Sequence, residues 1–457
     1  MEKKFFHHAL KILEGVCIGC THCMTICPTE AIRVKNGLAT LIDNRCVDCG
    51  MCFRNCPVHA IIIDHDDFNK IFKYKYRIVL LPSVLTAQFP EEISNNQIYS
   101  TLYEIGFNRV VEVEQGVDAL YEAQKEYVAN NQDDGPLISS FCPAIIRLIQ
   151  VKFPSLVNNI MLLKPPLDVT AIWLKQKLME EGATEEDIGI FYVTPCAAKI
   201  AAIKSPVGDD KSPITGVINM DFLFNKIYRV IKAGKSDQCI VPESQPLSKK
   251  GILWTLTHGE AANLEGRCLA IDEIHNVIEF LEKIENDEIT DIDFLELRAC
   301  DQSCAGGVLV SGNRFLTAER MRKRALVAPD HSKISFIGTG EANALHGQTI
   351  KADQVDLSIH EIKPRSMLKL DENRVEAMRK MQEVNNLVKK MPSLDCAACG
   401  APTCQALAED IVQGYGTINQ CFYIRDYKLS NELINSTESN KNLKEIWGEK
   451  TTNFDSL

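Results

Sequence analysis

The alternation of apolar and polar positions over residues 77–363 predicts short strands separated by amphipathic helices. Apolar, β-branched runs predict strands at residues 77–84, 109–114, 136–140, 188–193 and 294–299. Apolar positions three and four residues apart predict helices at residues 96–107, 117–130, 169–182 and 220–234. Because strands and helices alternate, we expect an α/β domain with a largely parallel sheet.

The two flanking segments differ from this pattern. Residues 1–63 contain two copies of one cysteine motif, each followed by a short apolar stretch that predicts a strand, at residues 31–34 and 60–64. Residues 366–391 predict a charged helix, and about the last twenty-five residues are polar and expected to be frayed or extended. We therefore predict three domains, at residues 1–75, 76–365 and 366–457.

Composition and charge narrow the range of partners and compartments. The chain carries a formal net charge of −11, so neither nucleic acid nor an anionic membrane is expected as a partner. No apolar run reaches the roughly eighteen residues of a membrane span, and the first residues lack the features of an export signal. The expected location is the cytoplasm.

Cysteine is the residue type that indicates chemistry. The chain has 18 cysteines, of which eight precede residue 57 and four lie between residues 396 and 421. In a reducing compartment, clustered thiols are more often ligands of soft metals than partners in disulfides.

The N-terminal motif is a doubled Cys-x2-Cys-x2-Cys-x3-Cys-Pro run, the pattern of bacterial ferredoxins with two [4Fe–4S] clusters. Three thiolates of one run bind one cluster, and the fourth cysteine binds the cluster of the other run. One predicted ligand set is Cys17, Cys20, Cys23 and Cys56. The other predicted ligand set is Cys46, Cys49, Cys52 and Cys27. Zinc or unligated thiols are the alternative, which two complete copies disfavour.

A second cysteine set lies near the C-terminus. Its members are Cys396, Cys399, Cys404 and Cys421, in the context DCAACGAPTC. The segment resembles the small [4Fe–4S] domain of some anaerobic electron-transfer and corrinoid enzymes, and Gly400 and Pro402 suit the tight turn between ligands. A zinc site is the alternative, because four thiolates also suit zinc.

Four central cysteines follow three predicted strands. They are Cys142, Cys196, Cys300 and Cys304. Cofactors bind at the carboxyl edge of a parallel sheet, so we expect these thiolates to converge there on a further cluster.

Residues 1–363 resemble the iron-only ([FeFe]) hydrogenases. Degraded forms of three family motifs are present, at Ser139-Ser140-Phe141-Cys142-Pro143, Thr194-Pro195-Cys196-Ala197-Ala198-Lys199 and Glu296-Leu297-Arg298-Ala299-Cys300 followed by Asp301-Gln302-Ser303-Cys304. A weaker match is Pro82-Ser83-Val84. The resemblance implies an iron-only hydrogenase catalytic domain between an α+β ferredoxin domain and a small helical Fe–S domain.

The resemblance also implies the cofactor and its ligands. The four central cysteines would hold the [4Fe–4S] part of an H-cluster, and Cys304 would bridge to a [2Fe] subcluster with CO, cyanide and azadithiolate ligands. Lys199 and Ser83 would donate hydrogen bonds to the cyanides. Together with the other sets, the chain would carry four [4Fe–4S] clusters.

Departures from the family motifs alter the expected function. Phe141 occupies the position of a cysteine that passes protons in the family, so we expect slow turnover. Such losses, with the C-terminal cluster domain, resemble the sensory subgroup often called group D. The implied function is an oxidoreductase that reacts slowly with H2 and protons and reports its redox state to a signalling or redox partner. A homodimer is one possible assembly.

Two alternatives stay open. The first is a catalytic hydrogenase with another proton route, through water or an acidic residue such as Glu296. The second is an iron–sulphur assembly or scaffold protein that lacks the di-iron unit. Retention of Lys199 and Ser83 favours the full H-cluster.

Overall fold

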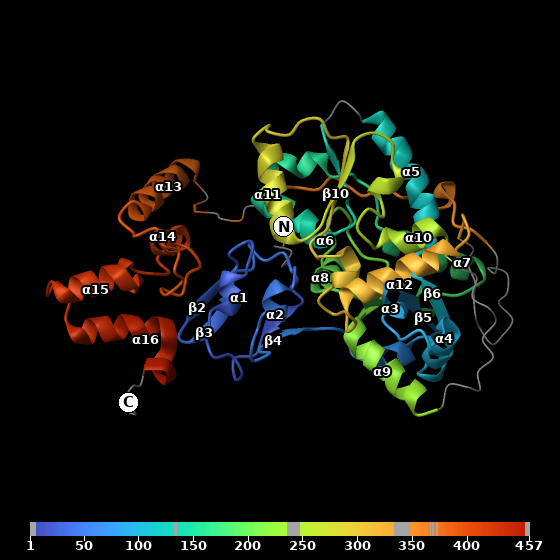
Figure 1. The fold of residues 1–457 in the computed structure, drawn as a ribbon, viewed down its shortest axis with the longest axis horizontal. Coiled ribbons are helices and arrows are strands. Elements are labelled where there is room, and N and C mark those ends of the chain that lie inside the picture. The colour runs from blue at the N-terminus through green and yellow to red at the C-terminus, as the bar shows by residue number, and fades with distance from the viewer. Residues whose placement is uncertain are drawn as a thin grey trace. The chain divides into compact units, whose positions relative to one another are not determined.

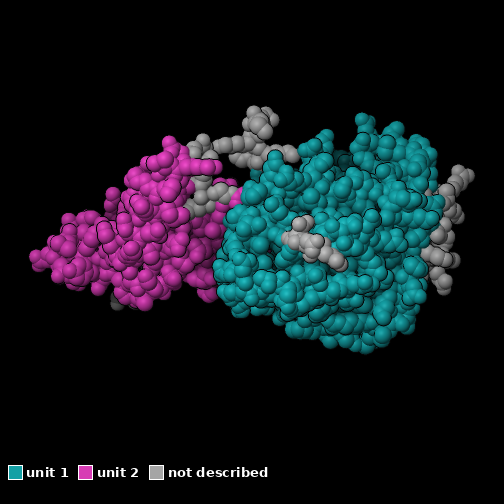
Figure 2. Space-filling view, turned by 90° about the horizontal axis from the view of Figure 1, so that it is seen from above, with its two compact units in different colours: residues 1–9, 65–364 teal, residues 10–64, 365–457 magenta. Residues whose placement is uncertain are grey.

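The computed structural model describes residues 6–131, 135–234, 247–332, 348–365, 367, 370–371 and 373–452. Within these residues the chain forms two compact units (Figures 1 and 2). Unit 1 comprises residues 1–9 and 65–364, and unit 2 comprises residues 10–64 and 365–457. The N-terminal and C-terminal cysteine segments therefore share one unit, although more than three hundred residues of sequence separate them.

Unit 1 contains two parallel sheets rather than the single sheet expected from the sequence. The first sheet has the strand order β6-β5-β8-β9 and consists of β5 (Tyr76–Leu81), β6 (Arg109–Glu112), β8 (Ile188–Thr194) and β9 (Gly216–Asn219). The second sheet has the order β10-β11-β7 and consists of β7 (Leu137–Ile138), β10 (Cys268–Ile271) and β11 (Phe294–Leu297). The five strands predicted in this region are all present, and β9 and β10 were not predicted.

Helices connect and cover these strands, as expected where parallel strands need crossover connections (Figure 1). The α-helices of unit 1 are α3 (Ser83–Thr86), α4 (Asn95–Glu104), α5 (Val117–Asn130), α6 (Pro143–Lys152), α7 (Pro166–Glu180), α8 (Ala197–Lys204), α9 (Met220–Lys232), α10 (Lys249–Trp254), α11 (Ile274–Glu285) and α12 (Arg314–Leu326). Strands β5 and β8 are buried throughout most of their length, which explains their continuous apolar sequences.

Unit 2 combines two short antiparallel strand pairs with a helical C-terminal part. Strand β1 (Leu10–Ile12) pairs with β4 (Ile61–Ile63), and β2 (Ile32–Lys35) pairs with β3 (Leu38–Leu41). Its helices are α1 (His22–Thr25), α2 (Met51–Arg54), α13 (Arg374–Val388), α14 (Cys404–Val412), α15 (Phe422–Ser430) and α16 (Ser436–Thr452). The prediction of a frayed or extended C-terminal tail is wrong over residues 436–452, which form α16.

Backbone hydrogen bonds join the N-terminal and C-terminal parts of unit 2. The turn between β2 and β3 consists of Asn36 and Gly37, both with positive φ, as a two-residue hairpin turn requires. The Asn36 and Gly37 amides donate to carbonyl groups of α16, at 2.8 and 2.9 Å. A Cβ atom on Gly37 would lie 2.5 Å from the Trp447 carbonyl oxygen, so this close approach requires glycine.

Two ion pairs with buried arginines reinforce this packing. Arg33 pairs with Asp410 at 2.8 Å, and Arg45 pairs with Glu409, which is itself buried. Both carboxylates belong to α14, the helix that begins at the third C-terminal cysteine. The ferredoxin-like segment and the C-terminal cysteine segment are therefore packed together in one folded body. Of the helices that the structure describes, none combines the length and the apolar character needed to cross a membrane.

Candidate functional site: cysteine clusters and a buried cavity

The four central cysteines of unit 1 follow the carboxyl ends of strands β7, β8 and β11. Cys142 follows β7 and is the N-cap of α6, and Cys196 follows β8 and is the N-cap of α8. Cys300 and Cys304 follow β11, in one turn closed by a 2.9 Å bond from the Ser303 amide to the Cys300 carbonyl. Helix N-termini carry partial positive charge, which favours thiolate ligands at Cys142 and Cys196.

Electrostatic interactions show that the thiols of Cys142, Cys196 and Cys304 are close together. Burial raises the pKa of the Cys196 thiol to about 12; Lys199 lowers it, and nearby Cys304 and Cys142 raise it. Buried thiolates in mutual contact require a compensating cation. A cubane of iron and sulphide meets that requirement, and the donor set of four soft ligands fits it.

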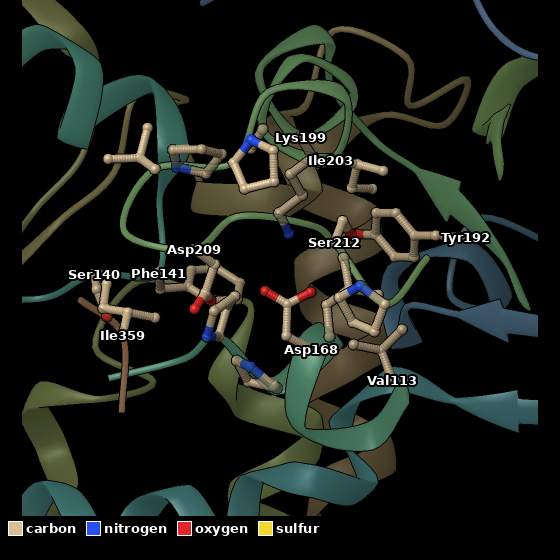
Figure 3. Close-up of a pocket in the computed structure, with 18 of the residues that line it drawn as sticks. Val113, Ser140, Phe141, Asp168, Tyr192, Lys199, Ile203, Asp209, Ser212 and Ile359 are labelled. Atoms are coloured by element: carbon tan, nitrogen blue, oxygen red, sulfur yellow. The ribbon is translucent and has the colours of Figure 1, made fainter. Parts of the chain in front are cut away.

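A cavity of about 90 Å³ adjoins these cysteines in unit 1 (Figure 3). Its walls include Pro82, Phe141, Pro143, Tyr192 and Trp254, so they are largely apolar. Figure 3 shows the Lys199 amine entering this space from one side and the Asp168 carboxylate from the opposite side. An apolar chamber with a few converging charged groups is suited to holding a small cofactor.

Lys199 links the cavity to the cysteine cluster. Its Nζ lies 3.8 Å from the Cys304 sulphur, the thiolate predicted to bridge the two parts of an H-cluster. Because Lys199 also lines the cavity, its ammonium group can donate hydrogen bonds to an anionic ligand held there. The residues present thus fit the predicted di-iron unit at this position.

Phe141 also lines the cavity, and two cations flank its ring. The Lys199 Nζ is 4.4 Å from the ring centroid, and the Arg298 guanidinium carbon is 4.3 Å from it. Trp254 meets the same ring edge-on, with centroids 6.3 Å apart. These contacts fix the ring in place beside the cysteine cluster, where it has no proton to transfer.

Ser83, predicted to contact a cyanide, has other partners in this structure. Its backbone amide and its hydroxyl group both donate to the buried carboxylate of Glu114, at 3.0 Å to Oε1. Burial raises the pKa of Glu114 to about 7, with the nearby Glu112 carboxylate adding to this and the Ser83 bonds opposing it. A cyanide contact by the Ser83 hydroxyl would require it to release Glu114.

Glu296, the acidic residue suggested for a proton route, belongs to a buried ion-pair network. It accepts bonds from the Glu260 and Ala261 amides, both at 2.9 Å, and lies 3.5 Å from Arg298. Arg298 also pairs with the fully buried Glu260. Glu296 does not line the cavity, so its contacts indicate a role in holding Arg298 beside Phe141.

The two ferredoxin-like sets of cysteines each surround a separate small cavity in unit 2. One cavity is lined by Cys17, Cys20, Cys23 and Cys56. The other is lined by Cys27, Cys46, Cys49 and Cys52. Each set thus contains the fourth cysteine of the opposite run, the exchange expected of interlocked ferredoxin motifs.

Burial also raises the pKa of thiols in the ferredoxin-like segment. It raises the pKa of Cys23 to about 12, and Cys17, Cys20 and Cys56 add to the effect. Thiols with such raised pKa values remain protonated without a metal, so metal binding would release their protons.

The C-terminal cysteines gather around the start of α14. Burial raises the pKa of the Cys399 thiol to about 11, and Cys421 and Cys396 lie close enough to add to it. The Cys404 amide donates to Asp395 at 2.6 Å, which closes the loop that carries Cys396 and Cys399. Gly400 has φ of 79°, and its carbonyl accepts a 2.9 Å bond from Val34 of β2. The predicted turn between ligands therefore packs against the ferredoxin-like segment.

Three segments of the chain match known families. Residues 77–250 match the family described as iron only hydrogenase large subunit, C-terminal domain. Residues 16–61 match a 4Fe–4S dicluster domain, and residues 391–423 match a family described as a putative Fe–S cluster.

Individual relatives are more distant. Iron hydrogenase 1 of Clostridium pasteurianum is 23% identical over 236 residues, which is 49% of this chain and 38% of that protein. This chain therefore spans well under half the length of that relative. A solved structure of the [FeFe]-hydrogenase HydA1 from Chlamydomonas reinhardtii is 14% identical, with a TM-score of 0.44, over 63% of this chain and 94% of that one. A second solved structure, of the [FeFe]-hydrogenase HydA(deltaEFG), was described for stepwise H-cluster assembly. It is 15% identical, with a TM-score of 0.40, over 61% of this chain and 94% of that one.

Proposed function

We propose that this chain binds an H-cluster, reacts slowly with H2 and serves as an H2 or redox sensor, because residues 77–250 match the iron-only hydrogenase family. Cys142, Cys196, Cys300 and Cys304 would hold the [4Fe–4S] part, and Lys199 would hold the di-iron unit in the adjoining cavity. When bound, that cofactor supplies the reversible cleavage of H2 into two protons and two electrons.

The observation that carries the sensory proposal is Phe141 in the cavity wall. A placed acid or base typically contributes about 10²–10⁴ in rate, and a phenyl ring offers no transferable proton. Held between Lys199 and Arg298, this ring occupies space that a proton relay or water would otherwise use. A slow proton exchange would let the reduced cofactor persist, which suits a sensor more than a catalyst.

Unit 2 supplies the features of an electron relay. Its two ferredoxin-like cysteine sets and its C-terminal set occur in one folded body, and Gly400 of the C-terminal loop bonds directly to β2. Cys396, in that same loop, is solvent-exposed. We propose that electrons pass among three [4Fe–4S] clusters here and leave to a redox or signalling partner at the C-terminal cluster.

Infrared spectroscopy tests this function. Protein reconstituted with iron and sulphide and then supplied with the di-iron unit should show CO and cyanide bands that shift under H2, with slow H2 turnover. Absence of these bands would favour an assembly or scaffold protein, and fast turnover would favour a catalytic hydrogenase.

Two substitutions of Phe141 distinguish the two possible causes of slow turnover, a missing transferable proton and space filled by the ring. Phe141→Cys restores a transferable proton, whereas Phe141→Ala only opens space. We expect Phe141→Cys to raise H2 turnover well above both wild type and Phe141→Ala. Equal rates in all three proteins would contradict the assigned role of the ring.

A further inference from the structure

The cavity contains a carboxyl group that the sequence motifs did not indicate. Asp168 lies in the first turn of α7, and its carboxylate points into the cavity opposite Lys199 (Figure 3). The side chain is partly buried, and the cavity is the space that it faces. Since Lys199 reaches Cys304, Asp168 stands across the proposed di-iron site from the cysteine cluster.

A second carboxyl group connects Asp168 with the surface. Asp209 also lines the cavity, and 25% of its side-chain surface is exposed. Lys164 Nζ lies 3.7 Å from Asp209 and 3.9 Å from Asp356, whose side chain is 78% exposed. The two carboxyl groups beside Lys164 are thus partly and largely exposed, while the Lys164 side chain itself is 9% exposed.

The surroundings of Asp168 suit proton exchange near neutral pH. Burial raises the pKa of its carboxyl group to about 7; the charge of Asp209 adds to this, and Lys164 opposes it. The N-terminus of α7 also opposes it, because its partial positive charge favours the carboxylate. The other titratable groups that face the same cavity are Glu114, Tyr192, Lys199 and Lys211.

We propose that Asp168 and Asp209 form a proton path between the cavity and the solvent, in place of the relay that Phe141 cannot provide. The path rests on the proposed H-cluster function. Each H2 oxidised releases two electrons, which pass to oxidised iron–sulphur clusters, and two protons, which must leave the cavity. Asp168 accepts one proton at a time as a carboxylate, passes it to Asp209 directly or through one water molecule, and is ready for the next.

The other acidic candidates near the site are less suited to this task. Glu296 does not line the cavity and its carboxylate is held by backbone amides and Arg298. Glu114 lines the cavity, but it is fully buried and accepts the Ser83 bonds. Among the carboxyl groups lining the cavity, Asp209 is a partly exposed neighbour through which Asp168 can exchange protons with solvent.

The first experiment needs no di-iron unit. Infrared spectra of the protein carrying only its iron–sulphur clusters should contain protonated-carboxyl absorption that titrates near pH 7, with contributions from Asp168 and Glu114. Part of this absorption should be lost in Asp168→Asn and another part in Glu114→Gln, whereas Asp353→Asn, at an exposed carboxylate that does not line the cavity, should retain all of it. Unchanged absorption in Asp168→Asn would overturn the assignment of Asp168 as a titrating group.

The second experiment uses protein loaded with the di-iron unit. We expect Asp168→Asn to slow H2/D2O isotope exchange at least about tenfold, Asp209→Asn to slow it less, and Asp353→Asn to match wild type. The pH profile of exchange should lose its inflection near pH 7 only in Asp168→Asn.

The outcomes separate the two proposals. Wild-type protein without CO and cyanide bands would refute the H-cluster function and with it the path. If the bands appear in all variants but Asp168→Asn exchanges isotopes as fast as Asp353→Asn, the path alone is wrong.

Discussion

Replacing Asp168 by Asn is expected to stabilise unit 1, and to do so more at high pH than at low pH. The pKa of Asp168 is raised from 3.8 to about 7, so between these values the folded protein binds a proton that the unfolded chain does not. Stability therefore falls as pH rises through this window and stays level above it. Asn keeps the shape of the neutral acid and cannot ionise, so the stability of the variant does not fall over this pH window.

The size of the effect follows from the shift. Each pH unit within the window corresponds to about 1.4 kcal/mol. Between pH 5.5 and pH 8, the advantage of Asn over Asp should therefore grow by up to about 2 kcal/mol, and by less where water in the cavity screens the charge.

Urea unfolding at these two pH values measures the effect. Trp173 and Trp254 are fully buried in unit 1 and report its unfolding, and a Trp447→Phe background removes the signal from unit 2. Asp353→Asn provides the control. Its free energy of unfolding should differ from that of wild type by the same amount at both pH values. If Asp168→Asn and wild type differ by the same amount at both pH values, the raised pKa of Asp168 is wrong.

Four further predictions concern the clusters and unit 2. Four [4Fe–4S] clusters should give about sixteen irons per reconstituted chain before the di-iron unit is added, by anaerobic iron analysis, and a clearly lower content would contradict the ligand assignment. Cys196→Ala should abolish the central cluster, as seen by electron paramagnetic resonance. Lys199→Ala should keep that cluster but lose the di-iron infrared bands faster than wild type, because the variant lacks the ammonium group that faces the cavity. Glu409→Ala should destabilise unit 2 by roughly 1.5–3 kcal/mol, because the buried Arg45 would keep only its longer ion pair with Glu30, at 3.6 Å. Thermal unfolding measures this, and a loss below about 1 kcal/mol would show that the Arg45–Glu409 pair is weakly coupled.

Ion-pair networks around the site were beyond the reach of sequence analysis. Arg298 stands out in the sequence only as a departure from a family motif, and nothing near it in the chain indicates its partners. Glu260 lies 38 residues away and Ser139 lies 159 residues away, yet all three meet in one buried network. Asp168 was missed for a related reason, since a carboxylate at the start of a helix ordinarily stabilises that helix and signals no further role.

The sequence by itself determined the features that are encoded locally. Cysteine spacing was sufficient to predict which cysteines share a ferredoxin-like cavity, because a loop of two or three residues between ligands leaves few alternatives. Hydrophobic patterning likewise located β5, β8 and the helices α4, α5, α7 and α9, because the periodicity of side-chain burial is a property of each element.

Only the tertiary structure decided what depends on contacts between distant segments. A strand pattern does not specify its neighbour, so one expected sheet became two, and β8 delivers Cys196 from a different sheet than the strands that deliver Cys142 and Cys300. The sequence of the C-terminal tail is polar and predicts an extended segment. The helix α16 forms there because it packs on the Asn36–Gly37 turn, more than four hundred residues earlier in the chain, and this contact is not encoded in the tail itself. The Asp168 carboxyl group is an ordinary acid in the sequence, and only the folded cavity removes it from water, places Asp209 beside it and raises its pKa.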